Sequence, residues 1–415
     1  MRRPNKDSQA RLSAESLRLV GSAQAVVQAA SRYEERYLER SLDGLLQKVL
    51  KGNHQEQIDA ALNHLFSNDL AAYDALMEAV EANSESMQLE LEENGVAVKY
   101  DCILVVAPIL AWTRFSIASG AIPADLLATL SMHLQAHMLA DGAKLALSPN
   151  LYSIDQMPRS HGEAYTLTQR LAQAALKSST LSPSKKLPEA APFLADTRYL
   201  IAAVAVPHGQ PFFRWQMAQH QANFAEVKKI ALEAWREQAL PNLGRMLPGC
   251  GLELLLPEAY YIACREADKA IRPVSVRAAV HFITHTLGRP PEDFCAAIAG
   301  FGEEMSEGQV DEYRISFLIK DEPQVVYGVV WPIYGMDEED AANQGLSPSG
   351  ARRATVDVIC NLLQEAGVTD IKRYSERFAP EYCDDCGTPL FVDLDADLAH
   401  PEMPDDTPAG GAHLH

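Results

Sequence analysis

The alternation of apolar and polar residues divides the chain into a helical start and a longer region of mixed strands and helices. Between residues 54 and 82, apolar side chains recur every three or four positions, which is the spacing of one helix face. They are Ile58, Leu62, Leu65, Phe66, Tyr73, Leu76, Met77 and Val80. Polar residues at 67–69 interrupt this stretch and can cap a second helix. The pattern predicts helix from residue 8 to about residue 93, within a helical region at 1–95.

After residue 95 the pattern changes to short apolar runs that alternate with amphipathic stretches. A first unit, 96–177, is predicted to contain strand, helix, strand and helix at 98–110, 123–140, 144–154 and 161–177. A stretch rich in Ser, Pro and Lys at 178–193 is predicted to be a linker. A second unit, 194–290, is predicted to repeat this order at 198–206, 222–240, 252–263 and 274–287.

Residues of the two units correspond at nearly constant shifts, which indicates an internal duplication. At a shift of 99, Tyr100 matches Tyr199 and Pro108 matches Pro207; at a shift of 100, Arg114 matches Arg214. The shift then becomes 108 for a last set, in which Pro149, Tyr152 and Ile154 match Pro257, Tyr260 and Ile262. The additional residues make about two helical turns, so they preserve the direction that the helix faces.

A third α/β segment is predicted at 291–378. It begins with a short helix at 292–299 and continues with strands at 313–319 and 325–333. Ser347 and Pro348 then start a helix that ends at Gly367, and a strand at 369–378 follows. Alternating elements of these lengths predict an α/β fold with some parallel strand pairing, and an α+β arrangement stays open.

The sharpest chemical motif lies in the tail at 379–415, where the sequence runs Cys383-Asp384-Asp385-Cys386-Gly387. Two thiolates three positions apart, followed by a glycine that lets the chain double back, form a turn that presents both sulfurs to one tetrahedral zinc ion. The tail has no second cysteine pair, so the other ligands are expected to be histidines. His413 and His415 are the candidates, with His400 as the alternative ligand.

A zinc ion in this tail is expected to be structural, because a short loop-rich segment buries too little apolar surface to order itself without a metal. A redox dithiol is a second interpretation of the motif. The flanking acids are expected to raise the thiol pKa, which argues against redox chemistry. An incidental cysteine pair that binds nothing also stays open.

Two histidine pairs have the i,i+4 spacing of one helix face, His133/His137 and His281/His285. Neither has a glutamate after its first histidine, which excludes the zinc-protease motif. We interpret both pairs as residues at the boundary between core and solvent. The acidic run 393–397 lacks the glycine and glutamate of a calcium loop, and we interpret it as solvated tail.

No template for a phosphate loop, a dinucleotide fingerprint or a hydrolase elbow is present, so the function stays open between two classes. The first is a binding or accessory protein with a structural zinc site. The second is an enzyme or small-molecule sensor, in which Arg114 and Arg214 bind an anionic metabolite in a cleft between the two units. Repeated packing residues are the other interpretation of this arginine pair. A nucleic-acid partner would require a basic face and is not expected.

The net charge of −20 is unevenly distributed. Residues 52–98 contain ten acids and residues 378–415 contain nine, with no Lys or Arg in either stretch. The other 330 residues therefore carry a net charge of only −1. Charge segregated in this way indicates basic protein partners at these two places, or simply solubility. It does not exclude anionic ligands, because the α/β body is nearly neutral.

The compartment is predicted from the same residues. No apolar run approaches the roughly 18 residues that span a bilayer, and no apolar segment follows the basic N-terminus as in an export signal. Five of the seven cysteines are isolated, as in reduced proteins. We therefore expect a cytoplasmic protein without a membrane partner.

Three segments carry a resemblance to a known family: Val329-Val-Trp-Pro-Ile-Tyr-Gly335, the knuckle at Cys383–Phe391, and the closing His413-Leu-His415. Over nearly its full length the chain resembles an uncharacterised betaproteobacterial family that is known only as a domain of unknown function. The resemblance implies no activity, substrate or catalytic residue.

Overall fold

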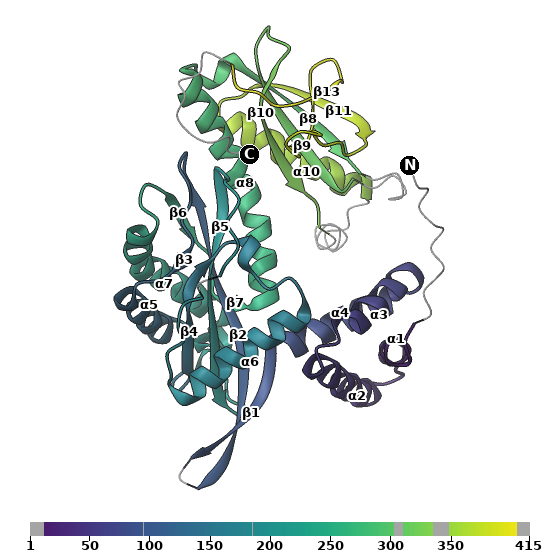
Figure 1. Cartoon of the computed structure of the whole chain (residues 1–415), viewed down its shortest axis with the longest axis vertical. Helices are drawn as coiled ribbons and strands as arrows, with labels where there is room; N and C mark the ends of the chain where they lie inside the picture. Colours follow the sequence, from purple (N-terminus) through teal and green to yellow (C-terminus); the bar gives the residue numbers. More distant parts are fainter. Residues whose placement is uncertain (1–11, 94, 185, 303–309, 335–347, 405–415) are drawn as a thin grey trace.

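The computed structural model describes residues 12–93, 95–184, 186–302, 310–334 and 348–404. Figure 1 shows a helical bundle, a large central sheet with helices on its two faces, and a smaller sheet at the opposite end. The mixed α/β class is confirmed.

Four helices form the N-terminal bundle: α1 (Ala14–Val27), α2 (Arg32–Lys51), α3 (Gln55–Asn68) and α4 (Leu70–Glu85). Asp69 separates α3 from α4 and is the N-cap of α4, because its side chain accepts a hydrogen bond from the Ala72 amide. The apolar stripe seen in the sequence forms the core of this bundle, with Ile58, Leu65 and Leu76 fully buried.

The prediction of helix up to residue 93 is wrong, because the chain turns into strand β1 (Ser86–Glu93) directly after α4. The odd-numbered residues Met87, Leu89 and Leu91 pack on the core, while Gln88 and Glu90 are exposed. This period of two is a strand pattern. It is hidden in the sequence by the adjacent acids, which are common on helix surfaces.

The central sheet has the strand order β1-β2-β5-β4-β3, and β6 and β7 pair with the second half of β2. Its remaining strands are β2 (Val96–Trp112), β3 (Gly120–Ala121), β4 (Lys144–Tyr152), β5 (Ala195–Pro207), β6 (Gly251–Leu254) and β7 (Glu258–Ala259). Every pairing in this sheet is antiparallel. In the described part of the chain, the expected parallel pairing occurs between β8 and β11 of the smaller sheet.

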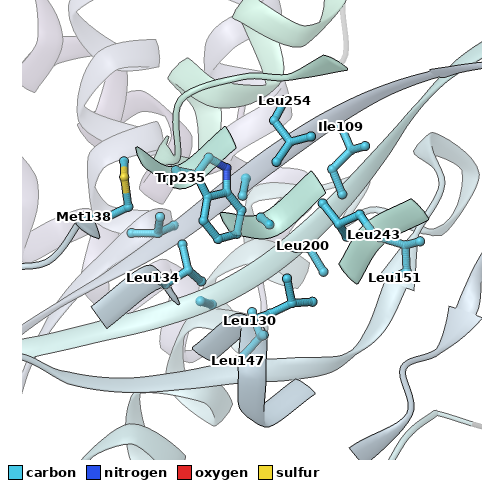
Figure 2. Packing of buried hydrophobic residues seen from close by; sticks show 14 of the residues in the cluster. Ile109, Leu130, Leu134, Met138, Leu147, Leu151, Leu200, Trp235, Leu243 and Leu254 are labelled. Atoms are coloured by element: carbon cyan, nitrogen blue, oxygen red, sulfur yellow. The ribbon is translucent and has the colours of Figure 1, made fainter. Parts of the chain in front are cut away.

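Helices cover both faces of the central sheet. On one face α5 (Ala124–His137) and α7 (Phe224–Met246) pack against alternate residues of β2, including Val105, Ala107 and Ile109. Figure 2 shows Trp235 of α7 in this layer together with Leu134 and Met138. On the other face α6 (His161–Lys177) and α8 (Tyr260–Leu287) pack against the intervening strand residues.

The central pair of strands relates the two predicted units. Tyr100 pairs with Pro207 and Pro108 pairs with Tyr199, so the residues that correspond at a shift of 99 exchange places across the β2–β5 ladder. The second strand of each unit pairs with the first strand of the other unit, β4 with β5 and β6 with β2. The duplication itself stays a prediction.

Two predicted boundaries in the second half of the chain are wrong. The strand expected at 252–263 ends at Ala259, and α8 begins at Tyr260 and continues past Pro273. The aromatic residues at its start favour a strand by propensity, but their burial against the central sheet is achieved from a helix. The helix expected at 292–299 is strand β8, which is buried along its whole length and so shows no alternation.

The smaller sheet has the order β10-β9-β8-β11. Its strands are β8 (Phe294–Phe301), β9 (Glu312–Ile319), β10 (Val325–Pro332) and β11 (Asp370–Phe378). The C-terminal half of α8 and helix α10 (Pro348–Glu365) cover one face. The hairpin of β12 (Phe391–Val392) and β13 (Leu398–Ala399) covers part of the other face. Helix α8 therefore contributes to both sheet cores, as Figure 1 illustrates.

The helical bundle is attached to the body through the last turns of α4. Arg265 of α8 donates to both carboxylate oxygens of Glu81, at 2.7 and 2.8 Å. The Tyr261 amide donates to Glu85 Oε2 at 3.0 Å. Burial raises the pKa of Glu85 to about 7. This carboxyl group therefore makes the attachment sensitive to pH.

We expect the Glu85→Gln variant to be more stable than the wild-type protein at about pH 8 and nearly equal to it at about pH 4. The pKa of Glu85 is higher in the folded than in the unfolded chain, so stability falls as pH rises from about 4.5 to about 7. The neutral amide removes this loss, which corresponds to about 3 kcal/mol. Urea unfolding at both pH values measures the difference. Glu90→Gln, at an exposed position, is the control; equal differences at the two pH values would contradict the assignment.

Candidate metal centre

The predicted knuckle is a tight hairpin held by backbone hydrogen bonds. The Cys383 amide donates to the Thr388 carbonyl oxygen at 2.8 Å, and the Gly387 amide donates to the Cys383 carbonyl oxygen at 2.9 Å. Gly387 has a φ of +74°, a conformation that glycine adopts without strain. One pair of hydrogen bonds thus closes the turn, as the Cys-x-x-Cys-Gly spacing predicts.

A histidine that is distant in sequence completes a cluster of three donors. The metal-binding atoms of Cys383, Cys386 and His400 all lie within 4.8 Å of one another. Cys386 Sγ lies 3.2 Å from His400 Nε2. The two predicted cysteines therefore lie close enough together to bind one metal ion. The third donor of this cluster is His400, which the sequence suggested as the alternative ligand. His413 and His415 lie outside the described residues.

His400 reaches the knuckle because the acidic run is a turn and not free tail. Asp393 Oδ1 accepts hydrogen bonds from the Asp395 and Asp397 amides, at 2.8 and 2.9 Å. This turn reverses the chain between β12 and β13, which pair in antiparallel fashion. The interpretation of 393–397 as solvated tail thus missed its role, which is to bring His400 back to the cysteines.

The surroundings of the three donors suit a metal. Hydrogen bonds from the side chain and backbone of Thr388, and one from His400, lower the pKa of Cys386 to about 6. The pKa of this cysteine is therefore lowered, whereas the flanking acids were expected to raise it. On the other side, His400 Nδ1 lies 3.4 Å from Glu402 Oε1. Nδ1 makes no hydrogen bond at this distance, and a short movement of Glu402 would let its carboxylate orient the ring, as carboxylates do behind ligating histidines.

Two thiolates and one imidazole nitrogen form a soft donor set that fits zinc. A structural zinc ion takes four ligands, and the described residues supply three. The set does not resemble the oxygen-rich sites of calcium or magnesium.

The knuckle is attached to the smaller sheet by groups that the sequence does not mark. Arg314 of β9 donates from Nη1 to the carbonyl oxygens of Glu381 and Leu390, at 2.8 and 2.6 Å. Phe391 packs over Gly328 so closely that a Cβ atom there would lie 2.3 Å from its ring. The hairpin with the donor cluster is therefore attached to the smaller sheet by contacts of the protein itself.

The other candidate residues do not form a common site. Arg114 follows the end of β2 and Arg214 follows the end of β5, and these two strands are antiparallel. Their ladder runs from Tyr100↔Pro207 to Trp112↔Ala195, a length of about 40 Å at roughly 3.3 Å per residue. The two arginines thus lie at opposite ends of the sheet, and the structure brings no cleft between them. Residues that follow corresponding ends of two antiparallel strands lie far apart. From the sequence we expected parallel pairing, in which they would lie at the same edge of the sheet.

Both histidine pairs lie on the helices where their spacing placed them. The rings of His133 and His137 are 6.2 Å apart on α5, and those of His281 and His285 are 4.0 Å apart on α8. Among the described residues, no third metal donor joins either pair in a cluster.

Comparison with known proteins bears on the family alone. In the described part of the chain, no helix is long and apolar enough to cross a membrane. Neither a curated protein nor a solved structure matches the sequence. The family model described as "Protein of unknown function (DUF2863)" matches residues 4–414, and the chain therefore belongs to this family.

Proposed function

We propose that this chain is a cytoplasmic binding or accessory protein whose C-terminal segment is fixed by a structural zinc ion. The observation that carries the proposal is the convergence of Cys383, Cys386 and His400 on a hairpin that packs against the smaller sheet. Metal binding there joins the knuckle to the β12–β13 hairpin, whose Phe391 and Val392 are buried against the smaller sheet. The ion then contributes folding free energy and performs no chemistry.

The fourth ligand in this proposal is His413 or His415. A bound water in the fourth position is the alternative, and it would give the open coordination of a catalytic site. The proposal of a structural site therefore depends on a protein ligand that closes the coordination sphere.

Cobalt substitution tests this proposal directly. Co²⁺ in a tetrahedral thiolate site gives intense visible absorption together with a sulfur-to-metal charge-transfer band. We expect both in the wild-type protein and neither in Cys383→Ser/Cys386→Ser. A His413→Ala/His415→Ala variant is expected to change the visible bands and to weaken Co²⁺ binding by about tenfold or more. Wild-type bands that are unchanged in the cysteine variant would contradict the site.

The acidic stretch at 52–98 is the surface that we propose for a protein partner, and some of its carboxylates are already paired within the chain. Of the ten acids at 52–98, four bind residues of the α/β body: Glu81 with Arg265, Glu85 with the Tyr261 amide, Glu90 with Lys99, and Glu93 with Lys144. The remaining acids of α3, α4 and β1 form the surface that we assign to a basic protein partner. The seven free cysteines support a reducing compartment.

A further inference from the structure

A groove in the smaller domain, which consists of the sheet β8–β11 with α10 and the C-terminal half of α8, combines an apolar floor with a cationic rim. It has a volume of about 540 Å³ and lies between the C-terminal half of α8, the loop at 289–291 and Ala366. Val280, Pro290, Pro291 and Ala366 supply its apolar part. Gly367 has a φ of +95°, and a Cβ atom there would lie 2.8 Å from Pro291. The floor therefore depends on a close backbone approach that only glycine permits.

Four side chains that carry or can accept a positive charge line the same groove: Arg277, His281, His285 and Arg289. The rings of His281 and His285 are stacked with centroids 4.0 Å apart. His285 Nδ1 lies 2.8 Å from the His281 carbonyl oxygen, which makes Nε2 the ring nitrogen available to a ligand. Burial, and then the charges of His285 and Arg114, lower the pKa of His281.

The neighbouring carboxylates neutralise this rim only weakly. Glu365 Oε2 lies 3.9 Å from Arg277 Nη2, and Glu322 Oε1 lies 3.4 Å from Arg289 Nη2. All four side chains are roughly half-exposed or more, so these contacts are screened by solvent. Two guanidinium groups beside a histidine pair form a rim that an anion stabilises.

We propose that this groove binds a phosphorylated small molecule. The phosphoryl oxygens accept hydrogen bonds from Arg277 and Arg289, because guanidinium groups match the geometry of phosphate. They accept one from Nε2 of His285 when this ring is protonated, since Nδ1 faces the His281 carbonyl oxygen. The apolar or aromatic part of the ligand covers Pro290, Pro291 and Ala366. The site is independent of the proposed zinc ion, which lies on the other face of the smaller sheet from α8.

Phenyl phosphate, inorganic phosphate and benzyl alcohol are the probes that separate the two parts of this site. In calorimetric titrations of the full chain at moderate salt, we expect phenyl phosphate to bind several-fold more tightly than inorganic phosphate. Benzyl alcohol is expected to show no measurable binding, because it lacks the charged group. Absence of phenyl phosphate binding at concentrations of about 10 mM would overturn the proposal.

Variants of exposed residues locate the site without risk to folding. Arg277→Ala and His285→Ala are each expected to weaken phenyl phosphate binding by about tenfold, and Arg114→Ala by less. Arg245→Ala is the matched control, because Arg245 is an exposed arginine paired with Asp125. Equal weakening by Arg245→Ala would show binding to net charge alone and would overturn the proposal. Binding of Zn²⁺ through His281 and His285 without any binding of phosphate would also overturn the proposal.

Discussion

Replacing Arg314 by alanine is expected to lower the free energy of unfolding of the smaller domain by about 3–5 kcal/mol. The side chain is 1% exposed and lies in the middle of the attachment between sheet and knuckle. Nε donates to Glu312 Oε1 at 2.6 Å, and Nη1 donates to two knuckle carbonyl oxygens. The guanidinium carbon lies 4.2 Å from the centroid of the Phe301 ring. Alanine would leave Glu312 without its cation and the Leu390 carbonyl oxygen without the Arg314 donor, while the Glu381 carbonyl oxygen would keep the Leu390 amide.

Two variants calibrate this expectation. Arg314→Lys keeps the charge but cannot donate to Glu312 and to the two carbonyl oxygens at once, so we expect an intermediate loss. Arg373→Ala is the matched control, because its ion pair with Asp357 is about half-exposed and is worth less than about 1 kcal/mol. Urea unfolding measures all three variants. A loss for Arg314→Ala no greater than that for Arg373→Ala would contradict the anchoring role.

The second large effect is expected on removal of the metal. Replacing both Cys383 and Cys386 by serine, or treating the protein with a strong chelator, should loosen the segment at 381–400. Structural zinc contributes on the order of 10 kcal/mol in isolated zinc fingers. Here the apolar contacts of Phe391 and the bonds from Arg314 retain part of the packing. We therefore expect local loss of amide protection at 381–400 and a melting temperature lower by roughly 5 °C, without global unfolding.

A conservative change in the same turn separates metal loss from damage to the loop. Asp384→Asn alters an exposed side chain that is not in the donor cluster, so protection at 381–400 should persist. Glu402→Gln, behind His400, is expected to weaken metal binding by about tenfold while the segment stays protected at saturating zinc. Protection that survives removal of both cysteines would show that packing alone orders the segment.

The part of this site that the sequence predicts is the part that depends on local spacing. The positions of Cys383, Cys386 and Gly387 define a turn through covalent geometry, so the knuckle follows from the sequence. His400 could be named only as an alternative, because its approach depends on the Asp393 turn and on the β12–β13 pairing. Arg314 lies about 70 residues away in a buried strand, and no local pattern distinguishes it from other strand residues.

The fold shows the same division. Helices α2–α4 have the patterns that burial of one face produces, and they were predicted. The long strands β2 and β5 are buried on both faces for most of their length, and they were predicted from their continuous apolar runs. Strand β8 is buried on both faces and so has no period, and its start after Pro290-Pro291-Glu292 resembles that of a helix. The start of α8 at Tyr260 carries strand-like residues whose burial comes from tertiary packing. The pairing direction of the central strands is also set by tertiary contacts and was not predicted.

The metal content of the untagged, natively purified protein tests the central claim most directly. We predict about one equivalent of zinc per chain in the wild-type protein, with the metal lost in Cys383→Ser/Cys386→Ser and retained in Asp384→Asn. Less than about half an equivalent, unchanged in the cysteine variant, would contradict the assignment of this cluster as a structural zinc site.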